Sequence, residues 1–169
     1  MHILREMGDF MFSIGDKIAY PMHGAGVIES IEEKEILGKK QHYYVMKMPV
    51  GNMKVMIPTK NVKGIGLRDI IDDEGVKKVF DILHKDDINV SNNWNKRYRE
   101  NMSKIKSGNI FEVARVVRTL MLRDGRKGLS TGERKMFNNA KQILVSELVL
   151  AKNLKSEQVE GMISNLSKA

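Results

Sequence analysis

The period of the hydrophobic pattern changes partway along the chain, and this change constrains the fold more than any other feature. From Phe12 to about Pro58, apolar and polar residues alternate in short stretches separated by glycines or charged breaks, which is typical of antiparallel strands. After the connector at 61–66, apolar residues recur at i, i+3, i+4 and i+7, a spacing that indicates amphipathic helices. A length of 169 residues allows two small modules that each bury a core.

The first region predicts four or five short antiparallel strands. The expected segments are IGDKIAYP (14–21), GVIESIEEKEI (26–36), QHYYVMKMP (41–49) and NMKVMIP (52–58). Gly24 and Gly26 are expected in a tight connection between the first two strands, and LGKK at 37–40 is expected at a hairpin tip. So small a sheet can bury its apolar face only by curling, and we therefore expect a barrel-like module.

The last expected strand has two distinguishable faces. Met53, Val55 and Ile57 share one parity, and we expect their side chains to be buried. Lys54 and Met56 have the other parity and should point away from the core. This strand therefore predicts a sheet with one covered and one open face.

The second region predicts a bundle of four or five helices. The clearest helix follows Asn109, which is a good N-cap, and carries Glu112 at the capping-box position. Gly125 and Gly128 should end it. Four other helices are expected: one near 73–84, one from Asn92 or Asn93 to Gly108, one from Ser130 to about Ala151, and a short last one. In the helix that ends at Gly108, Tyr98, Met102 and Ile105 are expected to face inward. The last helix is expected to run through Val159, Met162, Ile163 and Leu166. The expected fold class is therefore α+β, with an extension at 1–10, a β module at 11–64 and a helical module at 65–169.

Positive charge is concentrated in the helical half. The chain has 29 Lys and Arg against 21 Asp and Glu, a net charge of +8, which attracts polyanions. Five bases and one acid lie in 94–106, and seven bases and two acids lie in 115–135. Nucleic acid is the leading partner class, followed by an acidic protein surface or membrane headgroups. A solvated polar face remains the alternative for such charge runs.

Enzymatic and metal chemistry find little support in the sequence. The histidines, His2, His23, His42 and His84, are scattered without a metal-ligand spacing. The chain has no cysteine, which excludes disulfides and thiolate ligands. No phosphate-binding loop or nucleophile elbow occurs. We therefore expect a non-enzymatic protein with no catalytic residue, cofactor or metal site.

We expect a cytoplasmic location. No apolar run approaches the roughly 18 to 20 residues that a membrane span needs. The opening MHILREMGDF lacks the apolar core of a signal peptide. No heptad seam demands a dimer, so we expect a monomer.

Two explanations compete for Trp94, the single tryptophan. A lone tryptophan usually belongs to a core, often where a helix begins against its neighbour. Its surroundings are polar, however, because three asparagines flank it and Lys96 and Arg97 follow. An exposed indole beside bases that bind phosphate would suit a wedge against opened base pairs. The spacing alone does not decide between these explanations.

An ordered series of motifs resembles the CarD family of bacterial transcription regulators. The motifs are FSIGDKIAYPMHGAGVIESIE, NNWNKRYRENMSKIKSGN, VARVVRTLMLRD, GLSTGERKM and AKQILVSEL. The resemblance implies a Tudor-like or SH3-like β module, similar to the polymerase-interaction domain of transcription-repair coupling factors, that binds the β subunit of RNA polymerase. It also implies a helical module that binds promoter DNA and stabilises the open complex. The family's tryptophan wedge, at the upstream edge of the minus-ten element, falls on Trp94.

The resemblance also assigns expected contact residues. The DNA-binding set consists of Trp94, Lys96, Arg97, Arg99, Arg123 and Arg134. The polymerase-binding set consists of Lys34, Ile36, Lys54 and Met56. Met56 stands where the family commonly has a charged side chain, and a thioether cannot replace a guanidinium fork. The alternatives are a scaffold for acidic proteins and a nucleoid-type protein that binds nucleic acid without acting on promoter opening.

Overall fold

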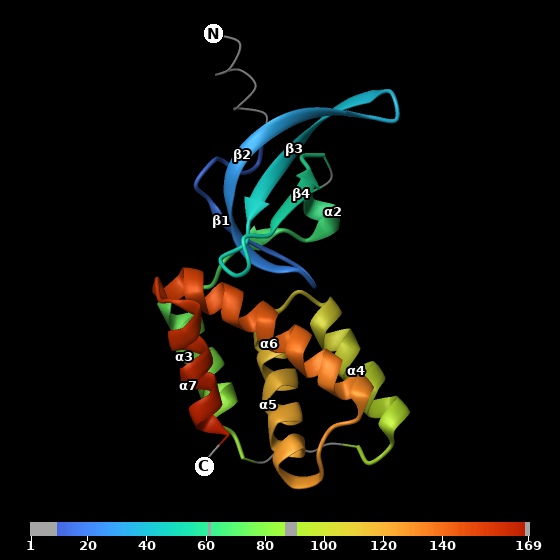
Figure 1. Cartoon of the computed structure of the whole chain (residues 1–169), viewed down its shortest axis with the longest axis vertical. Coiled ribbons are helices and arrows are strands. Elements are labelled where there is room, and N and C mark those ends of the chain that lie inside the picture. The colour runs from blue at the N-terminus through green and yellow to red at the C-terminus, as the bar shows by residue number, and fades with distance from the viewer. Residues whose placement is uncertain (1–9, 61, 87–90, 168–169) are drawn as a thin grey trace.

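The computed structural model describes residues 10–60, 62–86 and 91–167, and it shows a five-stranded sheet above a helical bundle (Figure 1). The strands are β1 (Lys17–Tyr20), β2 (Gly24–Ile36), β3 (Lys39–Lys47), β4 (Lys54–Pro58) and β5 (Arg68–Asp69). The helices are α2 (Val62–Ile65), α3 (Asp73–Leu83), α4 (Trp94–Lys106), α5 (Ile110–Lys127), α6 (Thr131–Lys152) and α7 (Ser156–Leu166). The expected α+β class with two modules is confirmed. Residues 1–9 of the expected extension lie outside the described ranges.

The strands are joined in the order β4-β3-β2-β1-β5, and all neighbours are antiparallel. Tyr44 on β3 lies opposite Ile57 on β4 and Ile31 on β2, which places these three side chains on one face. Tyr44 and Ile57 are fully buried. The Tyr44 hydroxyl accepts a hydrogen bond from the Phe12 backbone N–H at 3.2 Å, so the start of the module is tied to its core. Phe10, expected in the extension, also packs against this cluster.

Three expectations for the sheet were wrong in detail. Met53 lies between the turn at 51–52 and the start of β4 at Lys54, and it is 62% exposed. Gly24 and Gly26 belong to β2, and the tight connection consists of 21–23. Strand pairing also continues beyond residue 64, since β5 pairs with β1.

The helical module follows its expected caps closely. The Asn93 side chain accepts from Lys96 N, and the Ser130 hydroxyl accepts from Glu133 N. Asn109 caps α5 through Phe111 N. Gly125 lies within α5 and does not end the helix. The end comes at Gly128, whose φ of 74° breaks the helical backbone.

The inward face of α4 differs from the expected apolar stripe. The buried side chains are Arg97, Asn101 and Ile105, whereas Tyr98 and Met102 are only partly buried. The spacing of apolar residues could not predict this face, because two of its three buried side chains, Arg97 and Asn101, are polar. Met162 on α7, expected to face inward, is likewise 40% exposed.

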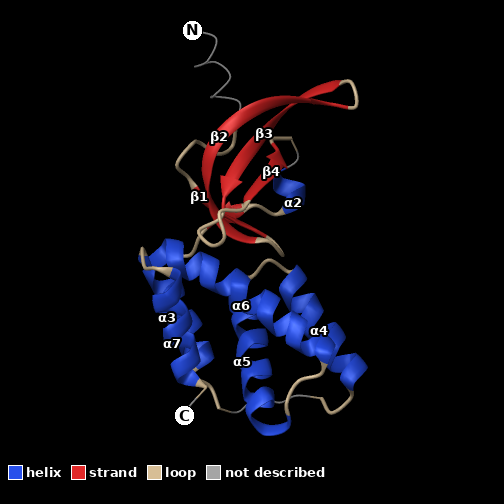
Figure 2. Cartoon of the chain, viewed as in Figure 1, coloured by secondary structure: helices blue, strands red, loops and turns tan. Residues whose placement is uncertain are grey.

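The sheet and the helical bundle form separate layers (Figure 2), and each has its own hydrophobic core. The helical core gathers buried residues from α3, α4, α5, α6 and α7, with α6 in contact with each of the other four. The same helix also contacts β2 of the sheet. Within the described ranges, no helix is long and apolar enough to cross a membrane, and no cluster of His, Cys, Asp or Glu could hold a metal ion.

Candidate nucleic-acid interface

Trp94 opens helix α4 and rests on the start of α6. Its ring stacks on Tyr98, with centroids 5.0 Å apart and an interplanar angle of 19°. The indole Nε1–H donates to the Ser130 hydroxyl at 3.1 Å. A Cβ built on Gly132 would meet the indole at 3.5 Å, so the rings lie against this glycine. Trp94 nevertheless keeps 41% of its surface exposed, which makes it a supported but open aromatic side chain.

A buried ion pair lies beneath the stacked rings of Trp94 and Tyr98, which together form the tryptophan platform. Arg97 donates from Nε to Glu133 Oε2 at 2.9 Å and from its terminal nitrogen to Oε1 at 3.1 Å. Both side chains are at most 3% exposed. The hydrogen bonds from Arg97 hold the pKa of Glu133 below its usual range, although burial opposes this shift. The same bonds hold the pKa of Arg97 above its usual range, so the pair stays ionised.

Ser130 connects the ion pair to the tryptophan. Its hydroxyl accepts from Trp94 Nε1 and from Glu133 N, and it lies 3.4 Å from Glu133 Oε1 as a donor. One small side chain therefore caps α6, orients the indole and contacts the buried carboxylate. Because Arg97 and Trp94 both belong to the first turn of α4, the network fixes where that helix begins.

The expected DNA-binding bases differ in how free they are. Lys96 and Arg99 are exposed on the outer side of α4, and Lys96 makes only a loose 3.9 Å pair with Glu100. Arg134 forms two hydrogen bonds with Asp124, which raise its pKa. A phosphate would have to compete with that carboxylate.

Two other arginines have their guanidinium groups beside the buried carboxylate of Glu133. Arg123 is 24% exposed at its side chain and lies 3.7 Å from Glu133. Its Nε is buried without a hydrogen-bond partner among the described residues. Arg97 requires a correction to the expected set, because it is 3% exposed and its guanidinium is occupied by Glu133 and the Ser91 carbonyl. It supports the site and does not reach its surface.

The expected polymerase-binding side chains share one face of the sheet. Lys34 on β2 lies opposite Gln41 on β3, and Met56 on β4 lies opposite Val45 on β3. Gln41 and Val45 are an even number of residues apart, so they share one face of β3. This register places Lys34, Ile36, Lys54 and Met56 on the face opposite the Tyr44 core. All four are exposed.

The lysines on this outer face have carboxylate neighbours. Lys54 lies 2.9 Å from Glu29, and its hydrogen bond lowers the pKa of Glu29 and raises its own. Lys34 lies 3.6 Å from Glu32. The outer face therefore presents exposed apolar side chains, Ile36 and Met56, among ion pairs rather than a simple basic patch.

The sequence did not predict the contacts that support Trp94 from behind, which are made by Ser130 and by the Arg97–Glu133 ion pair. The Ser-x-x-Glu spacing of Ser130 and Glu133 is explained fully by helix capping, so it does not point to a buried ion pair. Glu133 lies 36 residues from Arg97, and no local pattern links them.

The Arg97–Glu133 pair predicts a specific acid sensitivity. Because the folded-state pKa of Glu133 is lowered, its contribution is present above the unfolded value of 4.5 and is lost as the pH falls through the folded pKa. Glu133→Gln should reduce the free energy of unfolding at pH 7 by about 3 kcal/mol. It should also flatten the decline of stability in acid. Urea denaturation at a series of pH values measures both effects.

The exposed Glu160→Gln variant serves as the control and should unfold like the wild type. An equally steep acid decline in Glu133→Gln and the wild type would show that this carboxylate does not carry the pH dependence.

Comparison with known proteins places both modules in one family. The family model "CarD-like/TRCF RID domain" matches residues 12–71, which end just after β5, and "CarD, C-terminal domain" matches residues 78–164. The protein named "Putative transcription factor YdeB" in Bacillus subtilis (strain 168) is 45% identical over 151 residues, covering 89% of this chain and 99% of the relative. The chain therefore belongs to the CarD family of transcription regulators.

Proposed function

We propose that this protein binds RNA polymerase through its sheet and promoter DNA through α4, and that Trp94 stabilises the open complex. The observation that carries the proposal is the half-open indole, held from behind by Tyr98, Ser130 and Gly132. A side chain that served only the core would not need 41% of its surface in solvent. Membership of a family of transcription regulators supports a role at polymerase and promoter.

The physical basis is the stacking of an aromatic ring on bases that have lost a neighbour. A preoriented indole offers stacking area at low entropic cost, because its rotamer is already held by the Ser130 hydrogen bond. Lys96 and Arg99 supply contacts to phosphate, which position the protein without reading sequence. At the upstream edge of the minus-ten element, such a ring would favour the separated state over the paired one.

The polymerase contact is proposed on the outer face of the sheet. Lys34, Ile36, Lys54 and Met56 share that face, and Ile36 and Met56 are 49% and 41% exposed. Apolar packing of these two side chains against the β subunit would replace the charged contact that Met56 cannot make. The ion pairs with Glu29 and Glu32 would then orient the lysines rather than neutralise an acidic partner alone.

A second candidate is a nucleoid-type or scaffold role without an effect on promoter opening. The net charge of +8 favours it, since charge alone supports non-specific binding. It predicts that Trp94 can be removed without kinetic consequence. The supported position of the indole favours the first proposal.

Trp94→Ala should shorten the lifetime of the open complex. Loss of one stacked aromatic contact costs about 1 to 3 kcal/mol, or roughly a five- to 150-fold change in lifetime. Dissociation of polymerase–promoter complexes after addition of a competitor measures the lifetime. Met162→Ala is the matched control, because Met162 is equally exposed at 40% but lies on α7. Equal lifetimes for Trp94→Ala and the wild type would rule out the wedge.

Removing the two free bases of α4 should weaken DNA binding in a manner that depends on salt. Lys96→Gln combined with Arg99→Gln should lower the affinity for promoter DNA, and the slope of log K against log salt should fall by about two. Fluorescence anisotropy at several salt concentrations measures the slope.

The control is the combination of Lys152→Gln with Lys155→Gln, which removes the same charge from exposed positions at the C-terminal end of α6 and just before α7. If both pairs reduce the slope equally, the net charge of the protein and not the α4 surface determines binding.

A further inference from the structure

Helix α6 contains two buried glutamates, and each binds an arginine from a different part of the molecule. Glu133 and Glu147 are both 1% exposed. They are fourteen residues apart in one helix, which is close to four turns, so they face nearly the same side about 21 Å from each other. Glu133 holds Arg97 of α4 beneath the tryptophan platform. Glu147 holds Arg68 of β5, which belongs to the sheet.

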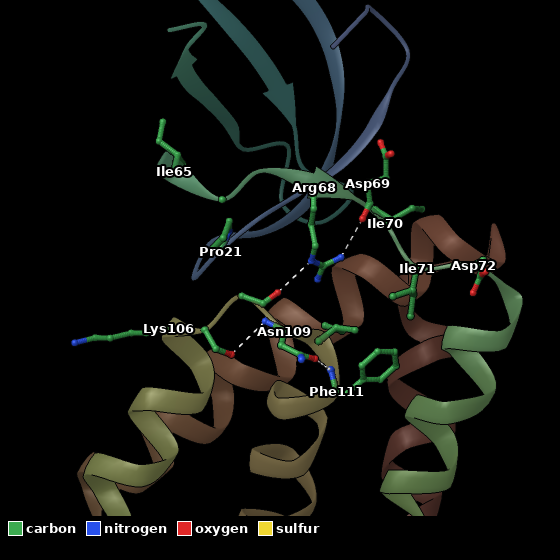
Figure 3. Close-up of a pocket in the computed structure, with 14 residues that line it drawn as sticks. Pro21, Ile65, Arg68, Asp69, Ile70, Ile71, Asp72, Lys106, Asn109 and Phe111 are labelled. Atoms are coloured by element: carbon green, nitrogen blue, oxygen red, sulfur yellow. Dashed lines mark hydrogen bonds between the residues drawn. The ribbon is translucent and has the colours of Figure 1, made fainter. Parts of the chain in front are cut away.

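The Arg68–Glu147 contact has the geometry of a fixed joint. Two terminal nitrogens of Arg68 donate to the two Glu147 oxygens, each at 2.8 Å. The same guanidinium donates from Nε to the Gly108 carbonyl at 3.1 Å, across the loop that joins α4 to α5 (Figure 3). Glu147 also accepts from Ile71 N at 2.9 Å. A fourth acceptor is the Asp69 carbonyl at 3.1 Å, and a planar guanidinium held in this way resists rotation as well as separation.

Two further hydrogen bonds and one close backbone approach hold the sheet against the same segment of α6. Ala25 N donates to the Ser146 hydroxyl at 2.9 Å in a buried position. A Cβ on Gly24 would come within 2.6 Å of that hydroxyl oxygen, so β2 approaches α6 as closely as a glycine permits. Lys17 Nζ donates to the Leu150 carbonyl at 3.2 Å. Strands β1, β2 and β5 therefore all contact one helix.

Apolar packing does not fill the boundary between the sheet and the helical bundle on every side. A cleft of about 690 Å³ lies beside Arg68, between β5 and the loop before α5, and its lining includes Pro21, Lys106 and Phe111 (Figure 3). The joint on that side therefore depends on the polar contacts of Arg68. Removing them would leave mainly the packing of Pro21 against Gly108 to define the angle between sheet and bundle on that side.

We propose that Arg68 and Glu147 are positioning residues that make α6 a rigid spacer between the polymerase-binding sheet and Trp94. The inference rests on the proposed function, in which the sheet is anchored on polymerase and Trp94 must meet the edge of the opened DNA. Helix α6 then fixes the distance between the sheet, which it binds at Glu147, and Trp94, which it supports at Ser130 and Glu133. A loosened joint would leave both binding surfaces intact and remove only their fixed relation.

The test is the double variant Arg68→Met with Glu147→Met. It removes both charges, so no buried charge is left unpaired, and methionine is an unbranched apolar side chain that can fill the space at either position. Arg68→Lys is the second variant, because it keeps the charge and loses the two-pronged contact. The chain has no cysteine, so Leu37→Cys on the hairpin tip and Lys155→Cys after α6 can carry spin labels in either background. Both positions are exposed.

We expect the label-to-label distance distribution, narrow in the wild type, to broaden in the double variant and less so in Arg68→Lys. Affinities for polymerase alone and for promoter DNA alone should stay within about twofold, whereas the open-complex lifetime should shorten at least fivefold. An unchanged distance distribution would overturn the joint. A broadened distribution with an unchanged lifetime would overturn its role in positioning.

The two proposals can fail separately. Equal open-complex lifetimes for the wild type and Trp94→Ala would overturn the wedge itself. The distance distributions would still decide whether Arg68 and Glu147 hold the sheet against α6.

Discussion

The structure depends on the burial of two carboxylates in helix α6. A buried carboxylate is tolerated only when it is paired and hydrogen-bonded, so Glu133 and Glu147 each require a fixed arginine partner. Arg97 satisfies the first and thereby sets the start of α4. Arg68 satisfies the second and thereby sets the sheet against the bundle. The relative placement of three parts of the molecule follows from two carboxylates that are closed off from solvent.

This constraint explains how an indole can be exposed and still ordered. Trp94 gains a stacking neighbour in Tyr98 and a hydrogen-bond acceptor in Ser130, so its orientation does not rely on enclosure. The bases around Trp94 likewise fall into a buried group and an exposed group. Arg97 serves the interior, while Lys96 and Arg99 stay at the surface, so the sequence overstates the number of free cations near the indole.

Local patterns predicted most of the fold. The change of period located the two modules, and Asn93 and Ser130 began their helices as expected because capping depends on neighbouring residues. Exposure of Met53 and continuation of α5 through Gly125 were missed, since both depend on where tertiary packing begins and ends. The inward positions of Arg97 and Asn101 were missed for a stronger reason. A polar residue is predicted outside unless its partner is known, and Glu133 lies on another helix.

The central proposal is that the exposed ring of Trp94 meets unstacked bases when the promoter opens. Because the chain has one tryptophan, 5-hydroxytryptophan incorporated in its place can be excited selectively in a complex with polymerase. Its emission can be compared on a fully paired promoter held closed and on the same promoter with a preformed bubble. We predict strong quenching by the bubble and emission on the closed promoter equal to that with polymerase alone. Equal emission in all three states would contradict the wedge.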